Sequence, residues 1–130
     1  MPFKSRPKSH LQSYPRRDTS GHFDWQQLRQ LAGEDSEFEA ELIAIFLQDA
    51  EHSIKQLESA IAAKSIQTIE EVAHSLRGSS ANVGASGLSA VASQLEQNAR
   101  KGEMTGAYGL LKQLNQHCLW IQSQFQSKPS

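Results

Sequence analysis

One histidine near the middle of the chain is placed for chemistry rather than for packing. It lies in the stretch AHSLRGSS, residues 73–80. If this stretch is helical, at about 100° per residue, its apolar residues cluster within about 60° of one another. His74 projects about 160–180° from the centre of that cluster. An imidazole opposite the core has no packing role, which indicates a nucleophile that accepts a group from another macromolecule.

Two neighbours suit His74 to receive an anionic group. Arg77 carries a permanent charge on a planar fork that matches phosphate oxygens. Gly78 costs a helix interior about 1 kcal/mol relative to alanine, which indicates that clearance matters there. An imidazole is a good nucleophile near neutral pH because a useful fraction of it is uncharged. The alternatives are an ordinary surface histidine and an arginine that simply pairs with Glu70 or another neighbour.

Composition and missing motifs exclude several classes of function. The chain has 130 residues, 38% of them hydrophobic, which is the length and composition of a single globular domain. The sequence has no glycine-rich phosphate loop and no zinc-ligand spacing, so we expect neither autonomous kinase activity nor a bound metal. The single cysteine, Cys118, favours a reducing compartment, and no apolar run approaches the roughly 18–20 residues of a membrane span. We therefore expect a cytoplasmic protein with no membrane partner.

The first 22 residues differ from the rest of the chain. They hold three prolines and five basic residues against one acidic residue, a net charge of +4, whereas the remainder carries −5. We interpret residues 1–22 as a flexible basic tail and residues 23–127 as one folded domain. A nucleic-acid-binding arm is the alternative for the tail. Because the folded part is too acidic to favour phosphate backbones, we expect no nucleic-acid partner.

The chain after the tail has helical periodicity throughout and no strand signal. Caps and breaks divide it into a short helix followed by four longer ones, of which the third of the five carries His74. The residues expected at the boundaries, in chain order, are Asp24 and Gly33, Asp35 or Ser36, Ser65 and Gly84, Ser86 with Gly87 as a break, Gly102, and Ala107 with Phe125.

Four amphipathic helices with short connections can bury their apolar faces only against one another. We therefore predict an all-α fold, an antiparallel up-down-up-down four-helix bundle with a short extra N-terminal helix. The long second helix is expected to bury Phe38 and Ile45, among others. Ser80 is expected on the flank of the core, bonded back to a helix carbonyl. Each buried apolar side chain contributes about 1.5–3 kcal/mol, so the core needs no metal or disulfide, and we expect a monomer.

The stretch HSLRGSSANVGA, residues 74–85, resembles the signature of histidine-containing phosphotransfer (HPt) domains, the intermediate carriers of multistep phosphorelays. The resemblance extends over most of residues 23–125 and includes LEQNARKG at 95–102. It implies that His74 accepts a phosphoryl group on the ring nitrogen that faces solvent. It also implies partners that carry receiver domains, namely response regulators and a hybrid histidine kinase. Those partners supply the aspartate and the Mg²⁺, so the carrier itself needs no cofactor.

The resemblance also assigns roles to residues near His74. Arg77 matches a basic residue that is more often lysine in the family, and Gly78 matches the glycine that opens the site to the partner. Ser79 falls where a small or hydroxyl-bearing residue usually stands. Glu96 stands where the family often has a glutamine beside the imidazole. Its carboxylate could orient the ring by accepting an N–H, but it would also repel phosphate.

A partner-docking surface is expected beside the site, with Leu28 and Ala81 as its candidate residues. Trp25 and Leu28 could equally cover one end of the bundle. The other histidines are interpreted as structural or incidental; they are His10, His22, His52 and His117. The sequence therefore favours a phosphotransfer carrier, and the alternative is a helical adaptor that binds a signalling partner without carrying phosphate.

Overall fold

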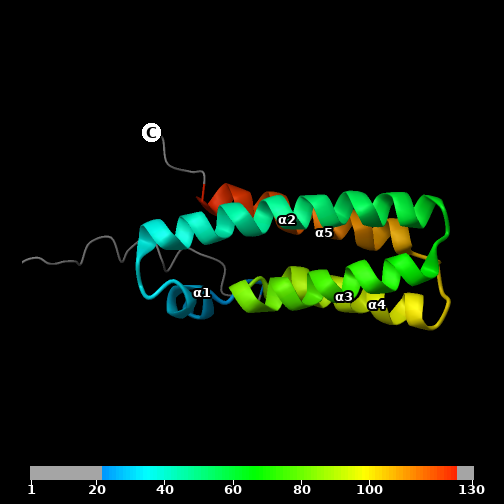
Figure 1. Cartoon of the computed structure of the whole chain (residues 1–130), viewed down its shortest axis with the longest axis horizontal. Coiled ribbons are helices and arrows are strands. Elements are labelled where there is room, and N and C mark those ends of the chain that lie inside the picture. Colours follow the sequence, from blue (N-terminus) through cyan, green and yellow to red (C-terminus); the bar gives the residue numbers. More distant parts are fainter. Residues whose placement is uncertain (1–21, 126–130) are drawn as a thin grey trace, which may run out of the picture.

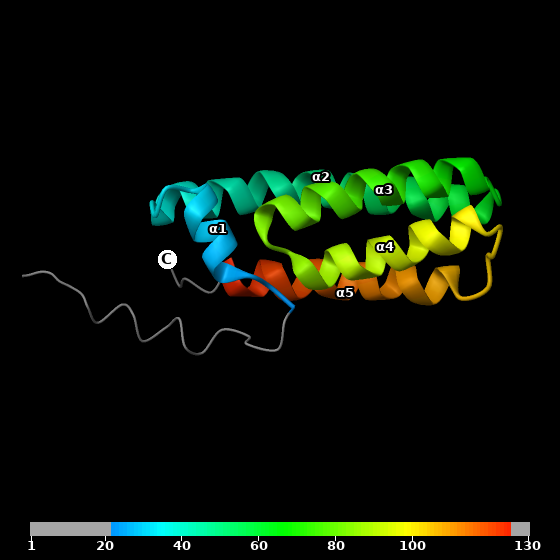
Figure 2. The same cartoon turned by 90° about the horizontal axis from the view of Figure 1, so that it is seen from below.

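Five α-helices make up the part of the chain that the computed structural model describes, residues 22–125. The four long helices lie side by side, with α2 and α5 on one side of the bundle and α3 and α4 on the other (Figure 1). The short α1 lies at one end, where it contacts α2 and α3 (Figure 2). The predicted all-α bundle with an extra N-terminal helix is confirmed. The helices are α1 Trp25–Leu31, α2 Ser36–Ala62, α3 Ile66–Val83, α4 Ser86–Arg100 and α5 Ala107–Phe125.

Side chains and one glycine set the helix ends, as the sequence predicts for α1 and α2. The Asp24 carboxylate accepts from the Gln27 backbone N–H at 3.1 Å, and Asp35 caps α2 in the same way. Gly84 ends α3 in the left-handed conformation, with φ of 90°. These signals are local, which is why the sequence predicts them well.

Two predicted boundary details differ in the structure. Ser65 occupies the N-cap position of α3, but its hydroxyl donates to the Thr68 hydroxyl at 2.9 Å and caps no backbone N–H. Ser86 and Gly87, expected as a break, are the first two residues of α4. Gly84 already reverses the chain direction, so the next helix begins directly after Ala85.

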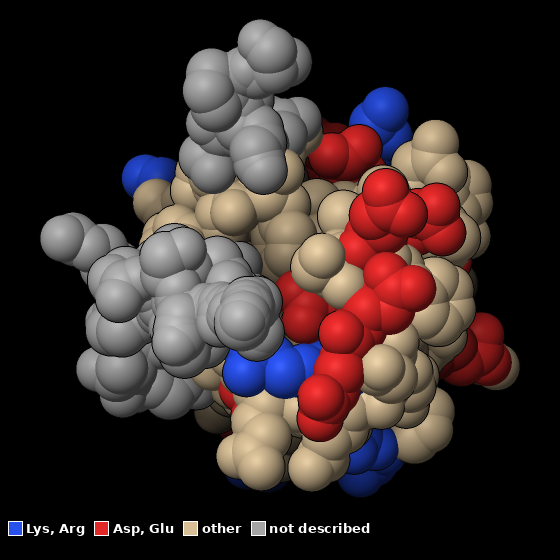
Figure 3. All heavy atoms as spheres, turned by 90° about the vertical axis from the view of Figure 1, so that its left-hand side faces the viewer, with Lys and Arg blue, Asp and Glu red and all other residues tan. Residues whose placement is uncertain are grey.

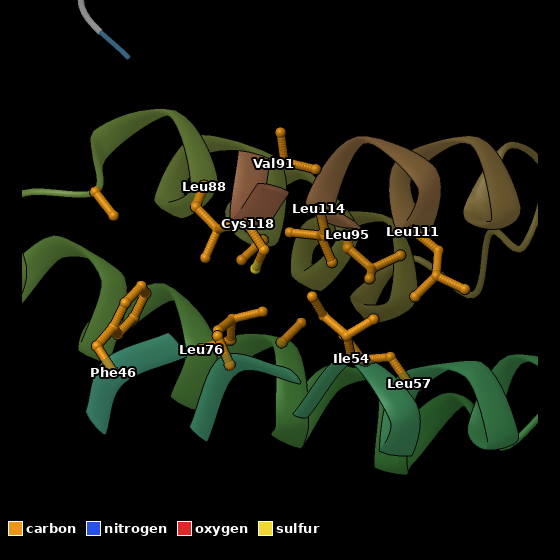
Figure 4. Close-up of a cluster of buried hydrophobic side chains, with 14 of the residues drawn as sticks. Phe46, Ile54, Leu57, Leu76, Leu88, Val91, Leu95, Leu111, Leu114 and Cys118 are labelled. Carbon is orange, nitrogen blue, oxygen red and sulfur yellow. The ribbon is translucent and has the colours of Figure 1, made fainter. Parts of the chain in front are cut away.

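The core is one cluster of apolar side chains between the four long helices (Figure 4). Leu57, Leu88 and Leu114 from three different helices are fully buried in it. Phe38 and Ile45 are not part of it, because 43% and 59% of their surfaces are exposed. Their prediction as core residues was wrong because α2 carries two apolar stripes. The buried stripe is Ile43, Phe46, Ala50, Ile54, Leu57 and Ile61.

The α3–α4 turn holds the segment that precedes α1. The Asp24 N–H donates to the Gly84 carbonyl at 2.7 Å, and the Gly87 N–H donates to the His22 carbonyl at 2.7 Å. A Cβ at Gly87 would lie 2.6 Å from Cε1 of His117, so any larger residue would have to displace that ring. His22, which composition places in the tail, is therefore attached to the bundle. The rest of the predicted tail, residues 1–21, lies outside the described residues, as do 126 and 127.

Within residues 22–125, no helix combines the length and hydropathy of a membrane span.

Ser80 occupies the core without a hydrogen-bond partner. It is fully buried, and its hydroxyl oxygen has no partner. The predicted bond to a helix carbonyl does not form. The Leu76 carbonyl one turn back accepts from the Ser79 hydroxyl, at 3.2 Å, and not from Ser80. When a buried hydroxyl has no partner, no hydrogen bond offsets the free-energy cost of removing it from water.

We therefore expect Ser80→Ala to raise the free energy of unfolding by about 1 kcal/mol, measured by urea denaturation. Ser79→Ala is the matched control, because it gives the same gain in helix propensity at an exposed position. Equal effects of the two substitutions would contradict the assignment of a cost to the buried hydroxyl.

Candidate functional site

His74 projects from the middle of α3 into solvent, as the helical projection predicts. Its side chain is 62% exposed, whereas Ala73 and Leu76 on the opposite face are buried. Among residues 22–125, no three side chains of metal-binding type come together. The ring is therefore accessible to another macromolecule, and what holds its orientation is a contact on one edge.

That contact is the carboxylate of Glu96 on α4, which is only 3% exposed. Its Oε2 lies 2.7 Å from Nδ1 of His74. The Arg77 Nε–H donates to Oε1 at 2.7 Å, and Nη2 of Arg100 donates to Oε2 at 2.8 Å. A buried charge is tolerated when it is paired and hydrogen-bonded, and here three side chains satisfy one carboxylate.

Glu96 stays ionised at neutral pH because of these partners. Burial by itself raises the pKa of its carboxyl group. The hydrogen bonds from Arg77 and His74, together with the positive charge of Arg77, outweigh burial and hold the pKa below its ordinary value of 4.5.

Nδ1 of His74 has two mutually exclusive partners. Arg77 Nη2 lies 3.0 Å from the same nitrogen that contacts Glu96. Arginine can only donate and an ionised carboxylate can only accept, so Nδ1 either donates to Glu96 or accepts from Arg77. The shorter bond to the charged acceptor is the stronger one, which favours the proton on Nδ1. The Nε2 atom then carries the free lone pair, as a nucleophile requires.

Arg77 does not pair with Glu70, one of the partners considered from the sequence. It pairs with Glu96, while Glu70 accepts from the Arg100 Nε–H at 3.1 Å. The Arg77 side chain remains 40% exposed, so part of its guanidinium can still meet an incoming anion. Sequence reasoning missed Arg100, although its position four residues after Glu96 is the spacing of a helical ion pair.

Two hollows flank the histidine on the α3–α4 face. One, of about 470 Å³, runs from Arg77 past Gly78 and Ala81 towards α1. The other, of about 720 Å³, is lined by His74 itself together with acidic side chains of α3, Glu96 and Arg100. A Cβ added at Gly78 would meet no atom within 4 Å, so nothing inside the protein requires glycine there. This supports clearance for a partner as the reason for Gly78.

The predicted docking residues have different positions. Ala81 is exposed and lines the first hollow. Leu28 is fully buried, so its proposed contact with a partner was wrong. Trp25 packs on Phe23 at 4.3 Å between ring centroids and on Trp120 at 6.2 Å, so this region covers one end of the bundle.

Ser79 is exposed, and its hydroxyl donates to the Leu76 carbonyl. The rings of His22 and His117 contact each other at 5.4 Å, and burial, followed by the charge of His22, lowers the pKa of His117. His10 lies outside the described residues.

The ionised Glu96 makes stability depend on pH in a predictable direction. Because its folded-state pKa is lowered, the unfolded chain takes up a proton first as the pH falls through about 4.5. The stabilisation is therefore complete above that value and is lost as the pH falls through the folded-state pKa. We expect Glu96→Gln to reduce this acid-side loss of unfolding free energy, measured by urea denaturation between neutral pH and about pH 3.

The matched control for this measurement is Glu103→Gln, which removes an exposed carboxylate. If both variants keep the pH dependence of the unmodified chain, Glu96 is not the group responsible.

Comparison with known proteins gives the family and the fold of this chain. The sequence matches the family model of the Hpt domain over residues 41–123, more than half of the chain. The fold is similar to histidine-containing phosphotransfer protein B (HptB) from Pseudomonas aeruginosa PAO1, with 28% identity and a TM-score of 0.77 over 85% of this chain and 96% of that chain. It is also similar to the histidine-containing phosphotransfer protein ZmHP2 from maize, with 25% identity and a TM-score of 0.78 over 91% of each chain. A search of curated proteins gives no match. The chain belongs to the Hpt domain family.

Proposed function

We propose that this chain is a phosphoryl carrier of a multistep phosphorelay. His74 takes a phosphoryl group from an aspartyl phosphate of one receiver domain and passes it to the aspartate of another. The observation that carries the proposal is an exposed imidazole whose Nδ1 lies 2.7 Å from a buried, ionised carboxylate. Response regulators and a hybrid histidine kinase are the proposed partners, and the cytoplasm is the proposed location.

The chemistry follows from the protonation pattern of the ring. The Nε2 lone pair attacks phosphorus, the P–N bond forms, and the P–O bond of the acyl phosphate breaks to release the aspartate as a carboxylate. The proton on Nδ1 stays there, and Glu96 offsets the positive charge that develops on the ring. In-line transfer needs Nε2 within roughly 3–3.5 Å of phosphorus, so this chain's contribution is presentation and orientation.

The negative charge of Glu96 does not oppose this transfer. Arg77 and Arg100 both donate to its carboxylate, and the carboxylate lies on the Nδ1 edge of the ring rather than beside Nε2. The exposed part of Arg77 is the cation that would steady the phosphoryl oxygens. In the alternative, a helical adaptor that carries no phosphate, the orientation of an exposed imidazole has no use.

His74→Gln removes the proposed acceptor atom and should abolish labelling. Incubation with a phosphorylated receiver domain and Mg²⁺ should place an acid-labile, alkali-stable label on the unmodified chain and none on the variant. His52→Gln, at an exposed position of α2, should label normally. Label that persists on His74→Gln would refute the site, and an unlabelled wild-type chain that still binds the receiver would favour the adaptor. ATP alone should leave the chain unlabelled.

Gly78→Ala should separate stability from transfer. Alanine in the interior of α3 is expected to raise the free energy of unfolding by about 1 kcal/mol. Because its methyl group projects into the space of an approaching partner, transfer should slow by on the order of tenfold to a hundredfold, measured by rapid-quench kinetics.

Gly109→Ala is the control for this pair of effects. Gly109 also lies within a helix with no atom within 4 Å of an added Cβ, but on α5. The substitution should also stabilise the chain, and it should leave the transfer rate unchanged. Normal transfer by Gly78→Ala would remove clearance as the reason for this glycine.

A further inference from the structure

A groove between α2 and α5 lies on the side of the bundle away from His74. The histidine and its carboxylate belong to α3 and α4, which form the other side (Figure 1). The groove has a volume of about 300 Å³. Its walls are largely apolar, with Ala44 and Leu47 from α2 and Phe125 from α5, and Glu51 adds a negative charge. The proposed phosphotransfer makes no use of this groove.

The groove opens close to the point where residues 1–21 join the bundle. The ring of Phe23 lies 4.3 Å from that of Trp25, which lies 5.5 Å from the ring of Phe125 in the groove wall. Two successive ring contacts therefore connect the start of the folded domain to the groove. An extended chain covers about 3.3–3.6 Å per residue, so a handful of residues before Phe23 is enough to reach it.

The charges of the two partners are opposite. The helix that forms one wall of the groove, α2, carries six acidic residues and one lysine. Acidic side chains also gather on the end of the molecule that carries α1 and the start of α2 (Figure 3). Residues 1–21 have a net charge of +4. Opposite charges attract within the Debye length, about 8 Å at physiological ionic strength.

The basic segment also contains apolar side chains that could fill the groove. Tyr14 lies two residues before the pair Arg16 and Arg17, and Leu11 lies three residues before Tyr14. A tyrosine ring buries a large apolar area while its hydroxyl stays at a wet rim. A lone run of cations would bind α2 only diffusely, whereas an aromatic ring followed by two arginines matches an apolar groove with one acidic residue, Glu51, in its wall.

We propose that residues 11–17 of this chain bind in the groove between α2 and α5, with the ring of Tyr14 against its apolar wall and Arg16 and Arg17 facing the acidic residues of α2. The contact closes an apolar surface and neutralises part of the charge of α2. It leaves the α3–α4 face open. The proposed contact is therefore independent of phosphotransfer at His74.

Paramagnetic broadening in the full-length chain tests this contact. A nitroxide on Ser13→Cys would stand next to Tyr14. Cys118 should stay unlabelled because it is buried, and burial, followed by the charge of Glu51, raises the pKa of its thiol to about 11. We expect strong broadening of the backbone amides of residues 44–48 and of Gln122, and none of residues 90–94 on α4. Broadening over another surface, or none, would overturn the proposal.

A pair of neighbouring substitutions provides the matched control. Ala44→Arg places a cation on the groove wall, while Ile45→Arg places the same cation one residue further round α2, at a position 59% exposed. Broadening should disappear with Ala44→Arg and persist with Ile45→Arg. Tyr14→Ala is the second variant, since it changes nothing in the described fold and should also abolish the broadening.

A mixed sample separates this contact from contact between two copies. Labelled chains without ¹⁵N are combined with unlabelled ¹⁵N chains, and the same amides are observed. Broadening in this sample would show that the segment of one copy occupies the groove of another, which would overturn the intramolecular proposal. Its absence, with broadening in the singly labelled chain, supports it.

Discussion

One buried negative charge sets the geometry of the site. An unpaired ion in a protein interior costs several kcal/mol, so Glu96 can be buried only where donors surround it. Those donors come from α3, through His74 and Arg77, and from α4 itself, through Arg100. The two helices must therefore pack in the one register that brings all three to the carboxylate. The orientation of the imidazole is a consequence of satisfying that charge.

The same cluster reconciles an acidic residue with phosphate chemistry. A glutamine beside the imidazole could either donate or accept, and would leave the position of the ring proton open. An ionised carboxylate accepts only, so it favours the proton on Nδ1. The cost of that choice is negative charge near an incoming anion, and the two arginines cancel it. Arg100 is in turn held by Glu70, so the charges alternate across the α3–α4 face.

Much of the fold could be predicted from the sequence because its signals are local. The caps at Asp24 and Asp35 and the reversal at Gly84 depend only on neighbouring residues. The buried face of α2 was predicted only in part, because a 27-residue helix with two apolar stripes does not reveal which stripe faces the core. Leu28 failed for a related reason, since a helix of seven residues has too few turns to define its inner face.

For the site, too, the features with local sequence signals were predicted and those that depend on helix packing were not. The exposure of His74 follows from the periodicity of its own helix, and it was predicted. The contact between His74 and Glu96 depends on how α3 and α4 pack together, and no local pattern specifies that register. The resemblance supplied the position of Glu96 but left two opposing effects open. In the structure Arg100 pairs with the carboxylate. The helical spacing of Arg100 to Glu96 was visible in the sequence but had no meaning until the carboxylate was known to be buried.

A side chain that must reach another protein cannot be fixed by burying it. Exposed side chains ordinarily move among several rotamers, and that freedom would have to be lost at each encounter. The ring of His74 is instead held at one edge by a hydrogen bond to Glu96. Its Nδ1 edge contacts a carboxylate that is 3% exposed, while 62% of the side chain faces solvent. The four-helix core therefore fixes the position of the Glu96 carboxylate, and that carboxylate fixes the orientation of a ring that is not part of the core. Exposure and orientation, which usually oppose each other, coexist because they belong to opposite edges of the same imidazole.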